Sequence, residues 1–256
     1  MRTIPFICMC ALCLASCSIK TDRTACPGLV RLTATGGDED LMQVFAEGTS
    51  SCYEGQISKA GGKAELSFEI ERGPLLLSVM SGLHNCGLAD NKVMIGQGGE
   101  MDEIYAVSDS LGIYSDIVEV SFVLHKQFAL LYLTIIESES ASYPYYVKVT
   151  GDVCGMDYTD MSPVRGPFSK LIRPVIGEYH VICLPRQADD SLGLEFYDRD
   201  LTKARDAPVD KIALGDYIRA AGYDWSREDL EDLYVNVDYT NANVSVQIRD
   251  WEMILL

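Results

Sequence analysis

The stretch IVEVSFVLHKQFALLYLTII, residues 117–136, decides the fold class because apolar and polar side chains alternate along it. A period of two is typical of a β-strand that buries one face. The apolar positions that carry the alternation are Val118, Val120, Phe122 and Leu124 and then, after a polar break around His125, Phe128, Leu130 and Tyr132. This pattern predicts a kinked strand or a pair of hairpin strands. Because Glu119, His125 and Lys126 interrupt it, we do not expect the stretch to cross a membrane.

Short β-type runs lie on both sides of this stretch. Those before it are residues 29–34, 64–70 and 74–80, with the turn sequences SKAGGK and ERG between them, while 102–116 is ambiguous and includes a candidate turn at 109–112. Those after it are 145–151, 178–185, 192–198, 234–239 and 243–251. We expect the last two to pair through the turn sequence TNAN, with Val244, Val246 and Ile248 pointing inward.

One segment has the pattern of a helix. Residues 210–222 place Ile212, Tyr217, Ile218 and Ala221 near one stripe, and Gly222 is placed to end the helix. Ser226 and Asp229 have the spacing of a capping box for a second short turn. Many short strands and few helices predict a mainly β fold of the β-sandwich class, with two sandwiches that meet near residues 115–119. Periodicity alone does not separate a sandwich from a barrel.

Composition excludes several classes of protein. The chain has 256 residues, 48% of them hydrophobic, which is enough for one large or two modest domains with a real core. The net charge of -17 would repel nucleic acids and anionic lipid headgroups. We therefore expect no nucleic-acid partner.

The N-terminus has the sequence of an export signal. Arg2 provides a positive charge, residues 4–15 form an apolar run, and Ser16 is a small residue directly before Cys17. Residues 14–17 resemble the lipobox of bacterial lipoproteins, in which the cysteine is acylated and becomes the first residue of the mature chain. Two or three acyl chains would hold such a protein in a membrane. The alternative is that Cys17 is one more thiol in a cysteine-rich signal peptide.

The remaining cysteines do not indicate a metal or redox site. Cys26, Cys52, Cys86, Cys154 and Cys183 are odd in number and contain no C-x-x-C pair. We expect buried thiols, or at most one or two disulfides.

No catalytic constellation is visible in the sequence. The histidines are His84, His125 and His180, and only His84 has a cysteine nearby, at Cys86. No nucleophile elbow, zinc motif or calcium loop occurs, so we expect no enzyme activity, no cofactor and no metal. We expect the carboxylate clusters at 38–40, 157–160, 188–190 and 227–232 to be solvated.

Aromatic residues leave one alternative function open. The sequence SYPYY at 142–146, with Trp225 and Trp251, could stack on sugar rings, although aromatic residues in strands more often belong to a core. A surface glycan-binding lipoprotein is therefore the second hypothesis.

Three segments have a recognisable pattern. They are DRTACPGLVRL at 22–32, FVLHKQFALLYLTI at 122–135, and the tail 212–252 with GYDW at 222–225, DLED at 229–232, Asp238-Tyr239 and Asp250-Trp251. Together with the lipobox they resemble the FimB/Mfa2 family of the Bacteroidetes fimbrillin superfamily, lipoproteins that anchor or assemble type V pili. The tail carries most of this resemblance, and residues 35–116 match only in layout.

The resemblance implies a domain order and a function. It implies a signal peptide at 1–16, a lipid-anchored tether at 17–28, and two transthyretin-like β-sandwich domains in tandem at 29–116 and 117–256. The protein would be held in outer-membrane lipid through acylated Cys17, at the cell surface or the base of a fimbria. It would be non-enzymatic and would bind a pilin (fimbrillin) subunit by β-strand complementation. The position in the pilus and the membrane leaflet stay open.

Overall fold

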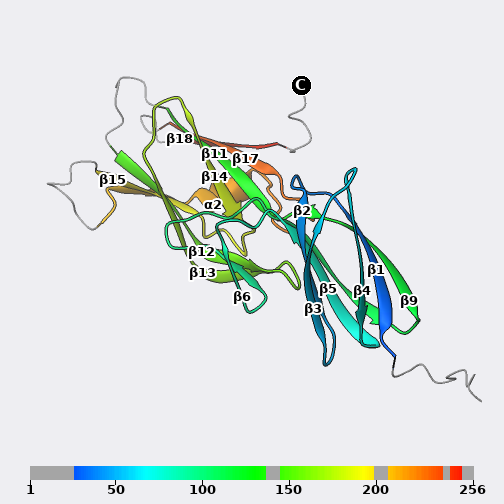
Figure 1. Ribbon diagram of the computed structural model, residues 1–256. Coiled ribbons are helices and arrows are strands. Elements are labelled where there is room, and N and C mark those ends of the chain that lie inside the picture. Colours follow the sequence, from blue (N-terminus) through cyan, green and yellow to red (C-terminus); the bar gives the residue numbers. More distant parts are fainter. Residues whose placement is uncertain (1–25, 137–144, 199–206, 239–242, 250–256) are drawn as a thin grey trace, which may run out of the picture.

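The computed structural model describes residues 26–136, 145–198, 207–238 and 243–249. These residues form a mainly β protein with four sheets and a single short helix, α2. Figure 1 shows two groups of strands side by side. One contains the blue and cyan N-terminal strands together with a green strand, and the other contains mostly green to red strands. We call these groups the N-terminal and C-terminal modules.

The N-terminal module consists of sheets A and B. In sheet A, β1 (Gly28–Thr35) lies between β4 (Lys63–Ile70), which is antiparallel to it, and β9 (Ile117–Val123), which is parallel. Sheet B has the order β10 (His125–Lys126), β8 (Tyr105–Ile113), β5 (Gly73–Ser81), β2 (Leu41–Glu47) and β3 (Cys52–Ser58). The inner faces of both sheets contribute to one hydrophobic core, in which Leu32, Leu77 and Val79 are almost fully buried.

The C-terminal module consists of sheets C and D. Sheet D has the order β14 (Tyr179–Pro185), β11 (Phe128–Ile136), β17 (Asp232–Asp238) and β18 (Asn243–Arg249). Sheet C has the order β16 (Asp210–Ile212), β15 (Gly193–Asp198), β12 (Tyr145–Asp157), β7 (Lys92–Met94) and β6 (Gly87–Ala89), and β13 (Pro163–Ile172) pairs with β12. Leu131, Phe196 and Val235 belong to its core.

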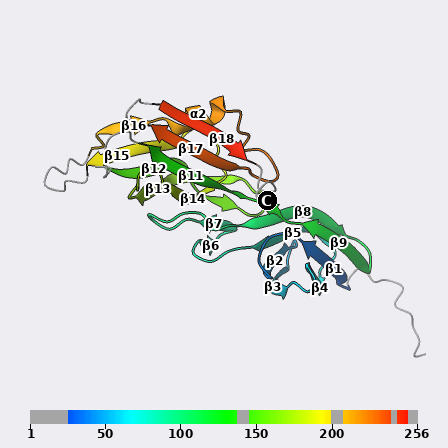
Figure 2. The same ribbon diagram turned by 90° about the horizontal axis from the view of Figure 1, so that it is seen from above.

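One hairpin from the N-terminal half of the sequence joins a sheet of the C-terminal module. Strands β6 and β7 belong to the N-terminal half of the sequence, yet β7 pairs with the end of β12 in sheet C. Figure 2 shows this hairpin between the two modules. Val93 and Met156, which lie opposite each other in this pairing, are buried in the core of the N-terminal module.

The deciding stretch 117–136 divides between the modules. Its first part is β9, in sheet A, and its last part is β11, in sheet D, so the prediction of one kinked strand or a hairpin is wrong. Val120, Phe122 and Leu124 are buried, as the alternation predicts. The phase then changes, because Lys126 and Gln127 are buried at the crossing and the core face of β11 becomes Ala129, Leu131, Leu133 and Ile135.

The strand pairing bears on the expected start of the second sandwich at residue 117. Residues 117–126 pair with β1 and β8 in the N-terminal module, and the first strand of sheet D in the sequence is β11. The division into domains at 29–116 and 117–256 stays a prediction of the sequence.

Most other predicted strands are present. The runs at 29–34, 64–70, 74–80, 145–151, 178–185 and 192–198 correspond to β1, β4, β5, β12, β14 and β15. The candidate turn at 109–112 is wrong, because β8 continues to Ile113 along β5. The last two strands pair as expected, and Val244, Val246 and Ile248 pack against the core, while the TNAN turn lies mostly outside the described residues.

The predicted helix is shorter than its pattern. Residues 210–212 form β16, and α2 runs only from Leu214 to Ala220, with Leu214 and Ile218 buried. Tyr217 and Ala221 are exposed, so the predicted stripe is wrong at these two positions. Gly222 ends the helix at a φ of +84°, a backbone angle that glycine adopts without strain.

Candidate functional site

The predicted lipidation site, Cys17, lies outside the described residues. Of the five cysteines that the structure describes, Cys86 and Cys183 are buried, Cys154 is half-buried, and Cys26 and Cys52 are exposed. All five are free thiols, so the expectation of buried thiols holds for two of them. The described helix is also too short to cross a membrane.

The three histidines lie apart and each has a local partner. His84 Nε2 contacts a carboxylate oxygen of Glu39, and His125 Nδ1 lies 3.0 Å from Asp229 Oδ2. His180 Nε2 accepts a hydrogen bond from the backbone N–H of Val175. None of these contacts includes a cysteine or serine nucleophile. In the part of the chain that the structure describes, no group of histidine, cysteine and carboxylate side chains could hold a metal ion.

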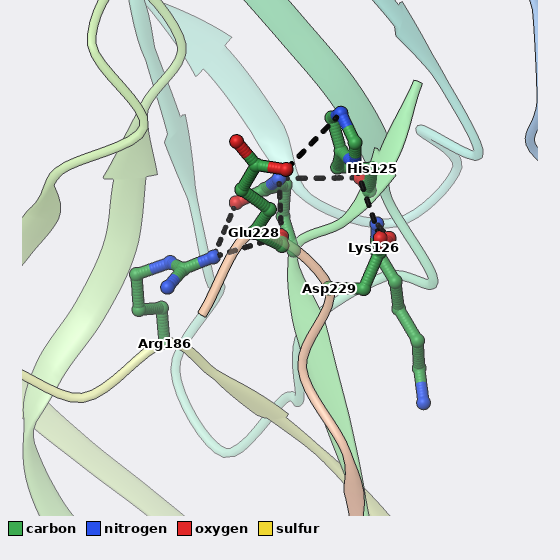
Figure 3. Close-up of polar contacts among 6 residues, drawn as sticks. His125, Lys126, Arg186, Glu228 and Asp229 are labelled. Atoms are coloured by element: carbon green, nitrogen blue, oxygen red, sulfur yellow. Dashed lines mark hydrogen bonds and ion pairs between the residues drawn. The ribbon is translucent and has the colours of Figure 1, made fainter. Parts of the chain in front are cut away.

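A network of polar contacts joins the modules at the crossing from β10 to β11. We call it the module junction: residues 125–127, Arg186, and residues 225–232. Asp229 accepts the backbone N–H of Lys126 at 2.7 Å as well as contacting His125, and Leu230 N–H donates to the carbonyl of Lys126 at 3.1 Å. Figure 3 shows the loop of Glu228 and Asp229 against this crossing. The predicted capping box is therefore wrong, since Asp229 binds a distant segment.

Ser226 also differs from the capping-box prediction. Its hydroxyl and its backbone N–H both donate to Asp224 Oδ1, two residues earlier. These two bonds form a tight local turn before the junction loop. Residues 225–226 accordingly form a turn and residues 227–229 a bend.

Arg186 connects a third segment to the module junction. Its guanidinium donates to the carbonyl oxygens of Trp225 and Glu228 and to the side-chain oxygen of Gln127. Figure 3 shows the guanidinium of Arg186 directed toward the backbone of the Glu228 loop. No pattern in the sequence singles out Arg186, because its three partners come from two distant segments.

The centre of the junction is a buried ion pair between Lys126 and Asp232. Asp232 Oδ1 also accepts the backbone N–H of Leu130 at 2.9 Å. The sequence predicted that the carboxylate cluster at 227–232 is solvated. This prediction is wrong for two of its members, because Asp232 is buried and Asp229 is hydrogen-bonded. Two of the segments that carry the family resemblance, 122–135 and the tail, thus meet here.

The other carboxylate clusters agree better with a solvated surface, although several members are bonded. Asp38 accepts the hydroxyl of Tyr105, and Asp189 forms an ion pair with Arg165 at 2.8 Å. Asp157 and Asp160 accept hydrogen bonds from Thr159 and Ser162 of their own turn.

The structure describes only some of the aromatic residues considered for glycan stacking. Tyr143 and Trp251 lie outside the described residues. Trp225 is half-buried against Tyr223, whose hydroxyl donates to the carbonyl of Glu231 at 2.7 Å. Tyr146 is half-buried under the guanidinium of Arg173.

Sheet D ends at β18 in the part of the chain that the structure describes. Among the described residues β18 pairs only with β17, and its side chains alternate between exposed and half-buried. The half-buried members, Val244, Val246 and Ile248, pack against the core of the C-terminal module. An additional strand at this edge could bond to free main-chain groups and cover the apolar side chains.

Comparisons with known proteins identify the fold. No protein-family model matches the chain, and no curated protein matches its sequence. A protein from Bacteroides thetaiotaomicron that is described as polysaccharide-binding has 11% sequence identity and a TM-score of 0.62, over 87% of this chain and 96% of its own. A protein from the same organism that is described as an adhesin has 11% sequence identity and a TM-score of 0.61, over 89% of this chain and 98% of its own.

The fimbrial anchor protein Mfa2 from Porphyromonas gingivalis also matches. It has 10% identity and a TM-score of 0.58, over 88% of this chain and 98% of its own length. The expectation that the chain is not an enzyme agrees with these matches to anchor and adhesion proteins. The resemblance predicted from the sequence is thus confirmed at the level of the fold: over most of its length, this chain has the fold of the fimbrial anchor protein Mfa2.

Proposed function

We propose that this protein is a non-enzymatic outer-membrane lipoprotein that anchors fimbriae or assists their assembly. Acylated Cys17 would hold it in the membrane, with residues 17–28 as a tether, and the two modules would be transthyretin-like β-sandwich domains in tandem. The fold shared with Mfa2 supports this role. The observation that carries the proposal is the edge of β18, which pairs with no described strand other than β17 and so offers a pilin subunit a place to add a strand.

The chemistry of β18 suits strand complementation. Main-chain N–H and C=O groups along the edge would provide affinity. Val244, Val246 and Ile248 would fix the register, because an incoming strand must place its apolar side chains beside them. A pilus subunit that ends in an extended apolar segment is the expected partner.

The binding edge can be tested with two neighbouring substitutions. Val246→Asp places a charge on the inward face, which opposes strand addition at an edge, while Ser245→Asp places the same charge on the outward face. We expect Val246→Asp to lower the recovery of fimbrial subunits with the protein from detergent-solubilised envelopes at least tenfold, and Ser245→Asp to leave it nearly unchanged. Thermal unfolding of both variants checks that Val246→Asp is folded. Equal recovery with both variants, or fimbriae unaffected by deletion of the protein, contradicts the proposal.

The lipid anchor needs a separate test. Replacing Cys17 by alanine should release the protein from the membrane fraction, and mass spectrometry of the native N-terminal peptide should show acyl chains on Cys17. A protein that stays with the membrane after this substitution, with no lipid mass on the native peptide, is not anchored in this way.

A further inference from the structure

A groove lies between the modules, at the edge of sheet D opposite β18. Its walls are the segment 96–103 between β7 and β8, the loop around His84, and strand β14. Its volume is about 680 Å³, within the range of known ligand sites. The groove does not contact β18, so it is separate from the edge proposed above.

One edge of β14 faces the groove, and its main-chain groups point toward the groove wall at Cys183. At Cys183, the carbonyl accepts the N–H of Met101 at 3.0 Å and the N–H donates to Glu100 Oε2 at 3.1 Å. In a strand, the N–H and C=O of one residue point to the same side, and this direction repeats every two residues. The main-chain groups of Val181 therefore also face this edge, where no described residue pairs with them.

The floor beside this edge is apolar. Val181 is 50% exposed on the outer face of sheet D, and half-buried Leu130 lies diagonally from it on β11, opposite Cys183. Tyr179, two residues before Val181, is 60% exposed. An extended segment paired with Val181 would cover these side chains.

The walls of the groove are acidic. Glu39, Glu100, Asp102 and Glu103 line it, against the cationic or titratable groups of His84 and Lys170. Three of the carboxylates are already bonded: Glu39 to His84, Glu100 to Lys170 at 3.2 Å, and Asp102 to the backbone N–H groups of residues 84–86. Glu103 is exposed and forms no hydrogen bond or ion pair with the described residues.

The geometry points to this groove as a second docking site, for an extended polypeptide segment that carries a lysine or arginine beside apolar residues. The segment would bond to the main chain of Val181, cover Val181 and Leu130, and place its basic side chain near Glu103. A cleft with walls of one charge concentrates ligands of the opposite charge. With β18 at the other edge of sheet D, the protein could then join two partners.

The test uses the whole soluble chain, residues 18–256, and a labelled capped peptide in which lysine and valine alternate over eight residues. A matched peptide with glutamate in place of lysine is the first control. We expect the lysine peptide to bind saturably and the glutamate peptide not to bind. Glu103→Gln should weaken it at least about threefold, the size expected for a partly exposed charge pair, and added salt should weaken it further. Val181→Pro removes the edge N–H and should weaken binding more strongly.

A second control separates the groove from the general negative charge of the protein. Glu65→Gln and Glu119→Gln each remove one carboxylate from the outer face of sheet A, far from the groove, and should leave the affinity unchanged. Equal weakening by these variants and by Glu103→Gln overturns the proposal, as does the absence of binding or a preference for oligosaccharides over the peptide. Val246→Asp should leave peptide binding intact, so failure of the groove and failure of the β18 edge are distinguishable.

Discussion

Lys126 and Asp232 form an ion pair in the interior of the protein, with 2.5 Å between Nζ and Oδ1 and only 3% of each side chain exposed. Lys126 belongs to β10 of the N-terminal module and Asp232 begins β17 of the C-terminal module. The pair therefore holds the two modules together where the chain crosses between them. Pairs at this depth are costly to form and still more costly to break on one side.

Removing one partner of this pair should destabilise the protein strongly. We expect Asp232→Ala to lower the free energy of unfolding by about 3–5 kcal/mol, because Lys126 would stay buried without a counter-charge. Glu119→Ala removes an exposed partner of Arg31 and should cost less than about 1 kcal/mol. Urea unfolding measures both. The double change Lys126→Met with Asp232→Leu should recover much of the loss, and a loss in Asp232→Ala no larger than in the control would contradict this role.

Acid should weaken the loop that borders the groove. Burial raises the pKa of Asp102, but the backbone N–H groups of residues 84–86 outweigh burial, and the net pKa lies below the usual 3.8. A carboxyl group with a lowered folded pKa contributes stability above its unfolded pKa and loses it as the pH falls through the folded pKa. Asp102→Asn should therefore cost about 1–3 kcal/mol at pH 7 and markedly less near pH 3.

Unfolding by urea at both pH values measures this difference. Glu65→Gln, on the outer face of sheet A, serves as the control and should change the stability by less than about 0.5 kcal/mol. A cost for Asp102→Asn that is the same at pH 3 and pH 7 would show that its charge does not matter.

The pairing of the β6–β7 hairpin with β12 requires a glycine at position 155. A Cβ atom at Gly155, in β12, would overlap the carbonyl oxygen of Val93 in β7. We expect Gly155→Ala to cost about 1–3 kcal/mol and to speed hydrogen exchange in residues 87–94. Gly96→Ala is the matched control, since no atom lies within 4 Å of a Cβ there and its φ is not positive. Unchanged exchange in the hairpin would rule out this close approach.

Thiol reactivity should follow burial. Burial raises the pKa of Cys86 to about 11 and that of Cys183 well above its usual value, so few of these thiols ionise at pH 8. Cys26 and Cys52 are exposed and should react with a thiol reagent in a fast first phase, before Cys86 and Cys183 react. Labelling followed by mass spectrometry assigns the phases, with urea-unfolded protein as the reference. Early labelling of Cys86 or Cys183 would contradict the buried environment.

Strands with alternating apolar side chains were predictable from the sequence. The pattern of β18 gave both its position and its inward face, because this strand buries one side only. Strands such as β3 were missed, since CYEGQIS contains few β-branched residues and is held by pairing with β2 rather than by propensity.

Long-range contacts explain the remaining differences. The β7 strand pairs with β12 more than sixty positions later, and no local pattern encodes such a pairing. Asp229 fits a local capping motif equally well, yet its carboxylate binds Lys126 from another module. In the same way, the sequence showed the motifs of the junction but could not show that they meet, and it offered no sign of Arg186 as their third member.

The order of strands in sheet D has a consequence for biosynthesis. β11 lies at the centre of the C-terminal core, and its neighbour β17 follows about one hundred positions later, with Leu131 opposite Leu233. As a chain emerges from the ribosome N-terminus first, β1 meets β9 long before β11 can meet β17. Of the described strands, β17 and β18 are the last to emerge, and β17 completes the pairing of β11 in this core. A nascent chain, or a chain truncated before residue 232, therefore lacks the β18 edge of sheet D.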